Sequence, residues 1–196
     1  MNTFTTTLNI ASGRIRIIAT DRTDATVRVL PADPGSSRDV KAAEQTVVEQ
    51  QDGTLRIHTP ESAKRAFGPS GSVEVTVQLP TGSRVLAELA DGELHSTGQL
   101  GEVTFTGANG TVGLDGTTTT RITLQAGDIR LGALAGDAEL TTAKGDITVT
   151  TAPGTSAVLD ASTAYGRVVN ALRNDGAPAV TVRASTSYGD VTARSL

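Results

Sequence analysis

The stretch AGDIRLGALAGDAELTTAKGDITV, residues 126–149, decides the fold of this chain because it contains the same short phrase twice. The phrase is a small residue, a Gly, a polar residue and an aliphatic residue. It returns at four further places: ADGELHS (90–96), ANGTVGL (108–114), AYGRVVN (164–170) and SYGDVTA (187–193). A phrase repeated at near-constant spacing is typical of stacked coils, in which each repeat contacts its neighbours.

The glycines of these phrases lie 17 to 23 residues apart, and weaker copies of the phrase begin about half-way between them, at Leu100, Thr119 and Ala135. The spacing predicts coils of two strands, each of about five residues, joined by tight turns. Gly suits such a turn because a positive φ costs it nothing, whereas other residues lose about 1–2 kcal/mol. The six glycines are Gly92, Gly110, Gly127, Gly145, Gly166 and Gly189.

An aliphatic side chain stands two residues after each of these glycines. Stacking the coils one strand spacing apart, about 4.8 Å, predicts that these side chains form a column inside a narrow core. The half-way copies supply a second set from the opposite wall, including Phe105, Ile122 and Leu140. The first column consists of Leu94, Val112, Ile129, Ile147, Val168 and Val191.

The N-terminal part of the chain alternates apolar and polar residues, which is typical of half-buried strands. Residues 31–38 indicate a loop, and Ser36 or Ser37 is a candidate cap for a short helix over residues 39–45. We therefore predict an all-β chain, a single-stranded β-solenoid domain over residues 1–196 with at most one short helix. Residues 1–82 would hold N-terminal strands with an insertion or cap at 31–72, and residues 83–196 the regular coils.

Composition excludes several classes of function. The 196 residues carry a net charge of −4 without a basic run, which argues against nucleic-acid binding. Aromatic residues make up only 3% and Trp is absent, so aromatic platforms for sugars or bases are scarce. The absence of Cys rules out disulfides, Cys-based zinc sites and thiol nucleophiles.

The N-terminal residues lack the charged start and long apolar run of a signal peptide. No stretch approaches the roughly 20 apolar residues that span a bilayer. We therefore expect a cytoplasmic protein without a membrane span, with export of a longer precursor as the alternative.

Two sets of residues resemble a known family. The chain opens with F-x-x-x-L-N-I-x-S-G-x-I-x-I at residues 4–17, and it repeats G-D-I-x-[LV] at 127–131 and 145–149. This pattern resembles the bacterial "putative adhesin" β-strand-repeat family, whose domains have no known function. The resemblance covers most of the chain. It implies a β-solenoid fold and an adhesin-like role, and it carries over no catalytic residues.

Acidic residues follow several repeat glycines, namely Asp128, Asp146 and Asp190. One interpretation is a calcium ladder, but the G-G-x-G-x-D pattern of calcium-binding β-rolls is absent. The simpler interpretation is that each Asp bonds the backbone of its turn. An alternative function is a carbohydrate-active enzyme, a polysaccharide lyase or hydrolase, with Asp128 and Asp146 beside Arg130 and Lys144 on the solenoid face.

The two histidines, His58 and His95, alternate outward from apolar neighbours, so we expect surface positions and neither a zinc site nor a catalytic triad. No phosphate-binding or dinucleotide-binding phrase occurs. We therefore predict a non-enzyme without cofactor or metal.

We predict that the chain is a scaffold or binding protein, which binds a protein partner or associates with another copy of itself. Tyr165 and Tyr188 occupy the same repeat position, so we predict that they stack and form a possible partner contact. Phe67, in the irregular stretch 60–72, is a third candidate contact. The chain stops at residues 191–196 without a recognisable cap, which suggests an exposed strand edge for pairing.

Overall fold

The computed structural model describes residues 3–60 and 71–196. Within them the chain is mostly β with one helix, which confirms the predicted all-β class. The elements are β1 (Thr5–Thr20), β2 (Thr26–Pro31), α1 (Ser37–Gln45), β3 (Val47–Gln51), β4 (Thr54–His58), β5 (Val73–Pro80), β6 (Arg84–Gln99), β7 (Glu102–Thr117), β8 (Thr119–Ala126), β9 (Ile129–Leu134), β10 (Ala138–Lys144), β11 (Ile147–Thr151), β12 (Ala157–Tyr165), β13 (Val168–Ala171), β14 (Val180–Tyr188) and β15 (Val191–Ser195).

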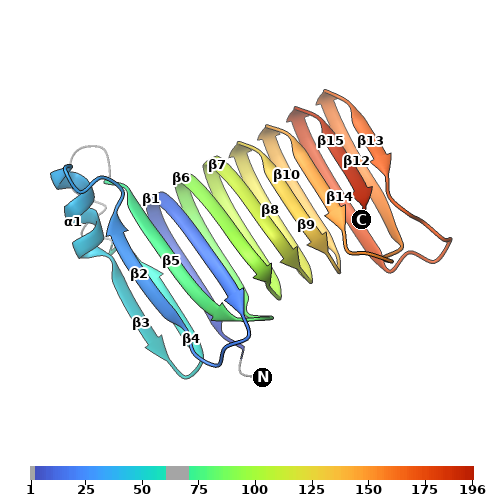
Figure 1. Cartoon of the computed structure of the whole chain (residues 1–196). Coiled ribbons are helices and arrows are strands. Elements are labelled where there is room, and N and C mark those ends of the chain that lie inside the picture. The colour runs from blue at the N-terminus through green and yellow to red at the C-terminus, as the bar shows by residue number, and fades with distance from the viewer. Residues whose placement is uncertain (1–2, 61–70) are drawn as a thin grey trace.

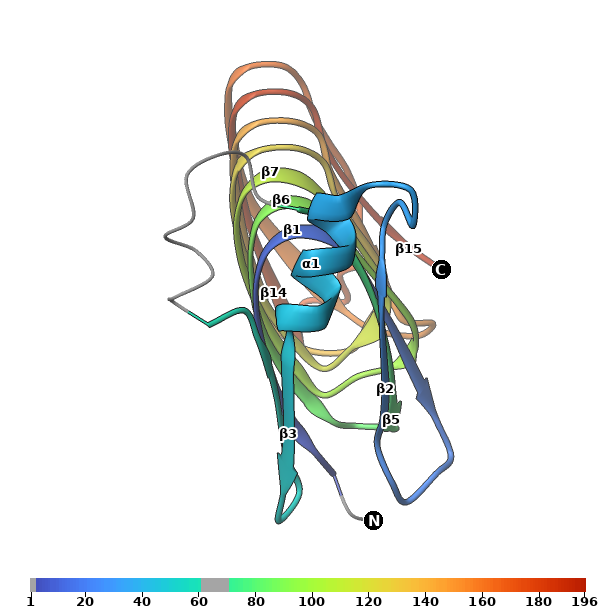
Figure 2. The same ribbon diagram turned by 90° about the vertical axis from the view of Figure 1, so that its left-hand side faces the viewer.

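Each repeat forms an arch, called a coil below, whose two limbs run in opposite directions on either side of the repeated Gly (Figure 2). Successive coils stack side by side, and each limb pairs in parallel with the equivalent limb of its neighbour (Figure 1). The register places Val112 between Leu94 and Ile129. Equivalent positions of the repeated phrase therefore meet along the stack.

The repeated glycines lie in one column with φ between +134° and +159°. A Cβ added to Gly110 would lie 1.6 Å from the carbonyl oxygen of Gly92, and one added to Gly127 would lie 1.5 Å from that of Gly110. The predicted positive φ is confirmed. The close approach of successive backbones is a second requirement for Gly, and sequence reasoning missed it.

The strands of the first coils are longer than the predicted five residues. β1, β6 and β7 each span 16 residues, because their pairing continues through the Gly corner, where Asp91 pairs with Asn109 and Gly92 with Gly110. From Gly127 onward each coil divides into two separate strands at its corner, as predicted.

Both limbs send apolar side chains into the space between them. The predicted column is fully buried at Leu94, Val112, Ile129, Ile147 and Val191. Phe105, Ile122 and Leu140 line the opposite wall and are also buried. Val168 is the exception in the column, because 45% of it is exposed.

The N-terminal end of the stack is covered. β4 and β5 pair in parallel with the two halves of β1, and β3 and β2 then pair with them in antiparallel fashion. α1 lies across this end between β3 and β2 (Figure 2), where Ala42 and Ala43 pack against the core. Ser36 caps α1 by accepting a hydrogen bond from the Asp39 N–H, as predicted.

The opposite end of the stack differs from the prediction. The last coil in sequence, β14 and β15, lies between the coil of β10 and β11 and the coil of β12 and β13. Residues 191–194 are therefore paired on both sides, and the expected open edge at 191–196 is wrong. Because the chain returns inside the stack, β12 and β13 form its final coil.

Candidate interaction surface at the open end

The first limb of the final coil is β12, which pairs with β14 on one side. Among the described residues, no strand pairs with its other side. The Val180 N–H donates to the Ser156 carbonyl at 3.3 Å, and backbone groups in a parallel ladder alternate between the two sides. The N–H and C=O groups of Leu159, Ala161 and Thr163 therefore point away from β14, toward the open side.

The second limb, β13, has the same arrangement. The Val191 N–H donates to the Arg167 carbonyl at 2.9 Å, so alternation directs the backbone groups of Val168 and Asn170 away from β15. Within the described part of the chain β13 pairs with β15 alone. The final coil thus presents unpaired backbone on both limbs, a template for pairing with another chain.

Exposed apolar side chains gather at this end. Val168 and Val169 are 45% and 49% exposed, and Tyr165 and Tyr188 are 67% and 56% exposed. β12 and β13 carry one charged residue between them, Asp160. An apolar patch beside unpaired backbone is typical of an interaction site.

The rings of Tyr165 and Tyr188 stack with centroids 4.9 Å apart and planes 5° from parallel. The predicted stacking is therefore confirmed, and it follows from the register, which pairs the two residues directly. Their role as a partner contact stays a prediction. Phe67, the third candidate contact, lies outside the described residues.

The acids after the repeat glycines form a ladder of hydrogen bonds from coil to coil. Asp128 Oδ1 accepts from the Asp146 N–H at 3.0 Å, and Asp146 Oδ1 accepts from the Asp190 N–H at 2.8 Å. The Arg167 N–H donates to Asp190 Oδ1 at 2.8 Å. These carboxylates bond the backbone of the adjacent coil rather than their own turn. The ladder ends at Arg167, which has no carboxylate.

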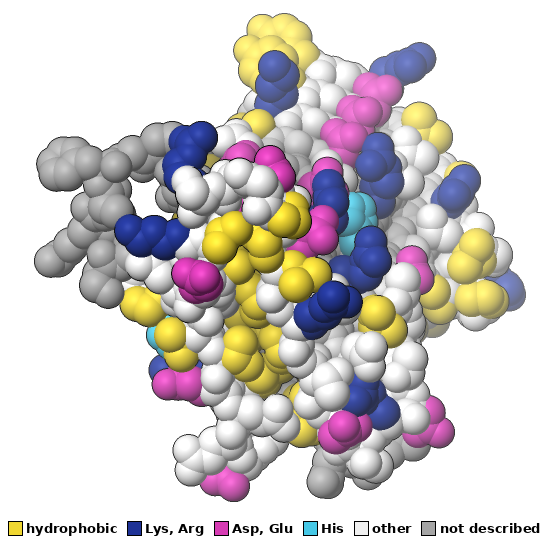
Figure 3. Space-filling model, turned by 60° about the vertical axis from the view of Figure 1, so that its left-hand side comes forward, with side chains coloured by type: hydrophobic (Ala, Val, Ile, Leu, Met, Phe, Trp, Pro, Cys, Tyr) yellow, Lys and Arg dark blue, Asp and Glu magenta, His cyan; other side chains and the backbone are white. Residues whose placement is uncertain are grey.

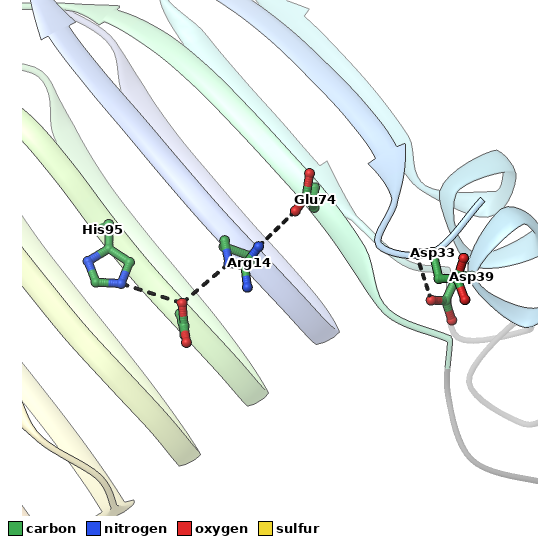
Figure 4. A network of polar contacts seen from close by, with 6 residues as sticks. Arg14, Asp33, Asp39, Glu74 and His95 are labelled. Atoms are coloured by element: carbon green, nitrogen blue, oxygen red, sulfur yellow. Dashed lines mark hydrogen bonds and ion pairs between the residues drawn. The ribbon is translucent and has the colours of Figure 1, made fainter. Parts of the chain in front are cut away.

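Other polar groups form pairs along the coil faces. Arg14 lies between Glu74, at 2.9 Å, and Glu93, at 3.3 Å, and His95 lies 3.5 Å from Glu93 (Figure 4). A hollow of about 250 Å³ lies beside Arg14, and Asp91 lines it as well. All four paired side chains are about half exposed, and exposed ion pairs contribute little stability.

Charges of both signs are interspersed across the face that Figure 3 shows. A second hollow, of about 470 Å³, is lined by alternating ion pairs, Arg84 with Glu102 and Arg121 with Glu139, each at 2.9 Å. Such alternation is typical of a solvated surface with cross-strand pairs.

The histidines do not share a site. His58 belongs to β4, which pairs with the first limb of β1, whereas His95 pairs with the second limb. His58 is partly buried rather than on the surface as expected, and His95 is about half exposed. In residues 3–60 and 71–196, no group of three or more His, Cys, Asp or Glu residues is placed to hold a metal ion. α1, the helix of this described part, is too short and too polar to cross a bilayer.

Among solved structures, the chain is similar to a "putative cell adhesion protein" from Clostridium sporogenes ATCC 15579. The identity is 12% and the TM-score 0.55, with 100% of this chain and 93% of the other covered. It also matches a "putative adhesin" from Bacteroides fragilis NCTC 9343 at 15% identity and a TM-score of 0.42, covering 98% and 93% of the two chains. The similarity to the Clostridium sporogenes protein shows a common fold. Among curated protein sequences, none matches the chain. Residues 85–195 match the Toastrack DUF4097 family, and the chain belongs to that family.

Proposed function

We propose that the chain is a single-stranded β-solenoid that serves as a non-enzymatic, adhesin-like binding module. Its binding site is the open end, where β12 and β13 add strands from a protein partner or from another copy of the chain. One observation carries the proposal: among residues 3–60 and 71–196, nothing pairs with the outer edges of the two limbs of the final coil, at the point where the apolar column stays uncovered.

Strand addition explains how this end gains affinity and specificity. Backbone groups of Leu159, Ala161 and Val168 would accept and donate the hydrogen bonds of an added strand, which supplies affinity without a deep pocket. The exposed Tyr165 and Val169 would add side-chain contacts, since Tyr is enriched at protein interfaces.

Photo-crosslinking tests this function. A photoreactive phenylalanine at Tyr165 should give a covalent adduct in native cell extract, with either a second copy or a different protein. The same group at Val48, which is 43% exposed at the N-terminal end, is the matched control. Equal adducts at both positions, or none at Tyr165, would contradict the proposal.

The hydrogen bonds of Asp128 and Asp146 support the non-enzymatic choice over a polysaccharide lyase or hydrolase. Each carboxylate accepts a backbone N–H of the next coil, and Asp128 also lies 2.9 Å from Arg130. These contacts give both acids a structural role. Polysaccharide cleavage that disappears in D128N or D146N would establish the enzymatic alternative.

A further inference from the structure

We propose that the partner at the open end is a second copy of this chain, joined end to end about a two-fold axis. This inference rests on the proposed function of that end and names its partner. In the pair, the final coil of one copy lies against the final coil of the other.

The direction of the limbs makes the final coil complementary to itself. The two limbs of a coil run in opposite directions (Figure 2). A two-fold axis that lies in the plane of the final coil, perpendicular to its strands, reverses the partner's strands. Each limb of one copy then meets a limb of the other in antiparallel orientation, so both open edges are paired at once. An interface of this kind uses the same patch on both copies.

The apolar column also supports a second copy as the partner. Val191 is fully buried because Val168 lies beside it in register, whereas no described strand lies on the outer side of Val168. On the other limb, Leu159 and Ala161 are partly buried against the core. A second copy supplies the missing layer to each column, and it is a partner whose coil has the matching width.

The open edge lacks the features that keep strand edges apart. Such edges usually carry Lys, Pro or inward charges, and β12 and β13 carry none of these. Their single charge, Asp160, lies in register beside Arg183 of β14. A second copy therefore approaches without strong repulsion between like charges.

The covered N-terminal end limits the assembly to two copies. A filament would need an N-terminal end that accepts the final coil of the next copy. β2 and β3, the outer strands at that end, carry Arg28, Pro31 and Glu49, and charged residues and Pro on an outer strand discourage pairing with another chain. α1 lies across this end between them (Figure 2). A closed pair follows rather than a filament.

Light scattering after size-exclusion chromatography, over a concentration series up to about 1 mM, tests the pair. We expect the mass to approach twice the 20.1 kDa of one chain and to stop there. Val168→Lys should weaken association at least about tenfold, because it places a charge at the centre of the interface. Val48→Lys, at a similarly exposed Val on the far end, should leave the mass unchanged.

A second variant separates loss of pairing from loss of folding. Ala161→Pro removes an N–H that points to the open side, so the ladder to β14 stays intact. Its circular dichroism spectrum should match that of the unaltered chain while its mass falls to that of a monomer. A monomer at every concentration, a mass that grows beyond two copies, or equal loss in Val48→Lys would overturn the inference. If the chain stays monomeric while Tyr165 crosslinks to another protein, the proposed function stands and the second copy does not.

Discussion

Val168 pairs directly with Val191, yet Val191 is fully buried and Val168 is 45% exposed. The two side chains hold the same position in the repeat and differ only in what lies on their far side. Burial of a Val contributes about 1.5–3 kcal/mol, so covering the exposed end of the column would stabilise the molecule further. This difference between two equivalent residues locates the candidate interaction surface.

The glycine column predicts a large effect for Gly110→Ala. The new Cβ would lie 1.6 Å from the Gly92 carbonyl oxygen, and φ is +145°. Two coils would have to separate locally, so we expect a loss of more than about 2 kcal/mol in the free energy of unfolding. Urea denaturation followed by circular dichroism measures it.

Gly154→Ala is the matched control for that experiment. Gly154 also has a positive φ, +76°, but no atom lies within 4 Å of the position of its Cβ. This variant should lose only the free energy that a positive φ costs Ala, about 1 kcal/mol. If Gly154→Ala and Gly110→Ala lost the same free energy of unfolding, the close packing of the coils would not require Gly in the column.

The acid ladder predicts different results for Asp146→Asn and Asp146→Ala. Asn keeps an oxygen that accepts from the Asp190 N–H, whereas Ala removes it, at a cost of about 1 kcal/mol. Thermal unfolding compares the two variants. A structural ladder predicts the same melting temperature with and without calcium, and a rise on adding calcium would instead support a metal site.

One pH-dependent contact lies beside the final coil. Ser156 donates to Asp175 Oδ1 at 2.6 Å and the Ala177 N–H donates to it at 3.2 Å, and these bonds lower the pKa of Asp175 below its ordinary value. Both favour the carboxylate, so their contribution is present at neutral pH and is lost as pH falls through the lowered pKa. Ser156→Ala should raise the pKa of Asp175, as an NMR titration would show. An unchanged pKa would mean that Ser156 is not its main cause.

The tyrosine pair has a spectroscopic signature, because the chain has two Tyr and no Trp. Tyr165→Phe and Tyr188→Phe should each alter the near-ultraviolet circular dichroism of the stack while stability changes by less than about 1 kcal/mol, since both rings are largely exposed. Signals that simply add from two independent rings would contradict the stacking.

Much of the architecture could be predicted because the repeat has a strict period. The burial of Leu94, Val112 and Ile129 follows from their position two residues after each Gly, and the Tyr165–Tyr188 stack follows from their shared position before it. Both depend on local pattern, which the sequence displays directly.

The order of the last two coils could not be predicted in the same way. The phrases at Gly166 and Gly189 satisfy the same local rules, so either coil fits beside Gly145. In the structure Gly189 lies there, with Gly166 outside it. One signal was available: Asn170 breaks the apolar pattern and Arg167 replaces the acid, as expected for a coil with no neighbour on one side. The pairing of β4 with β1 is likewise long-range and leaves no local mark.

The interleaved final coil has a consequence for biosynthesis. The coils up to β11 can be laid down one after another as the polypeptide leaves the ribosome. β12 and β13 emerge next, but the strands that join them to the rest, β14 and β15, are made after them. The uncovered coil therefore docks only after β14 and β15 have been made, and a chain truncated before Val180 would lose two coils rather than one.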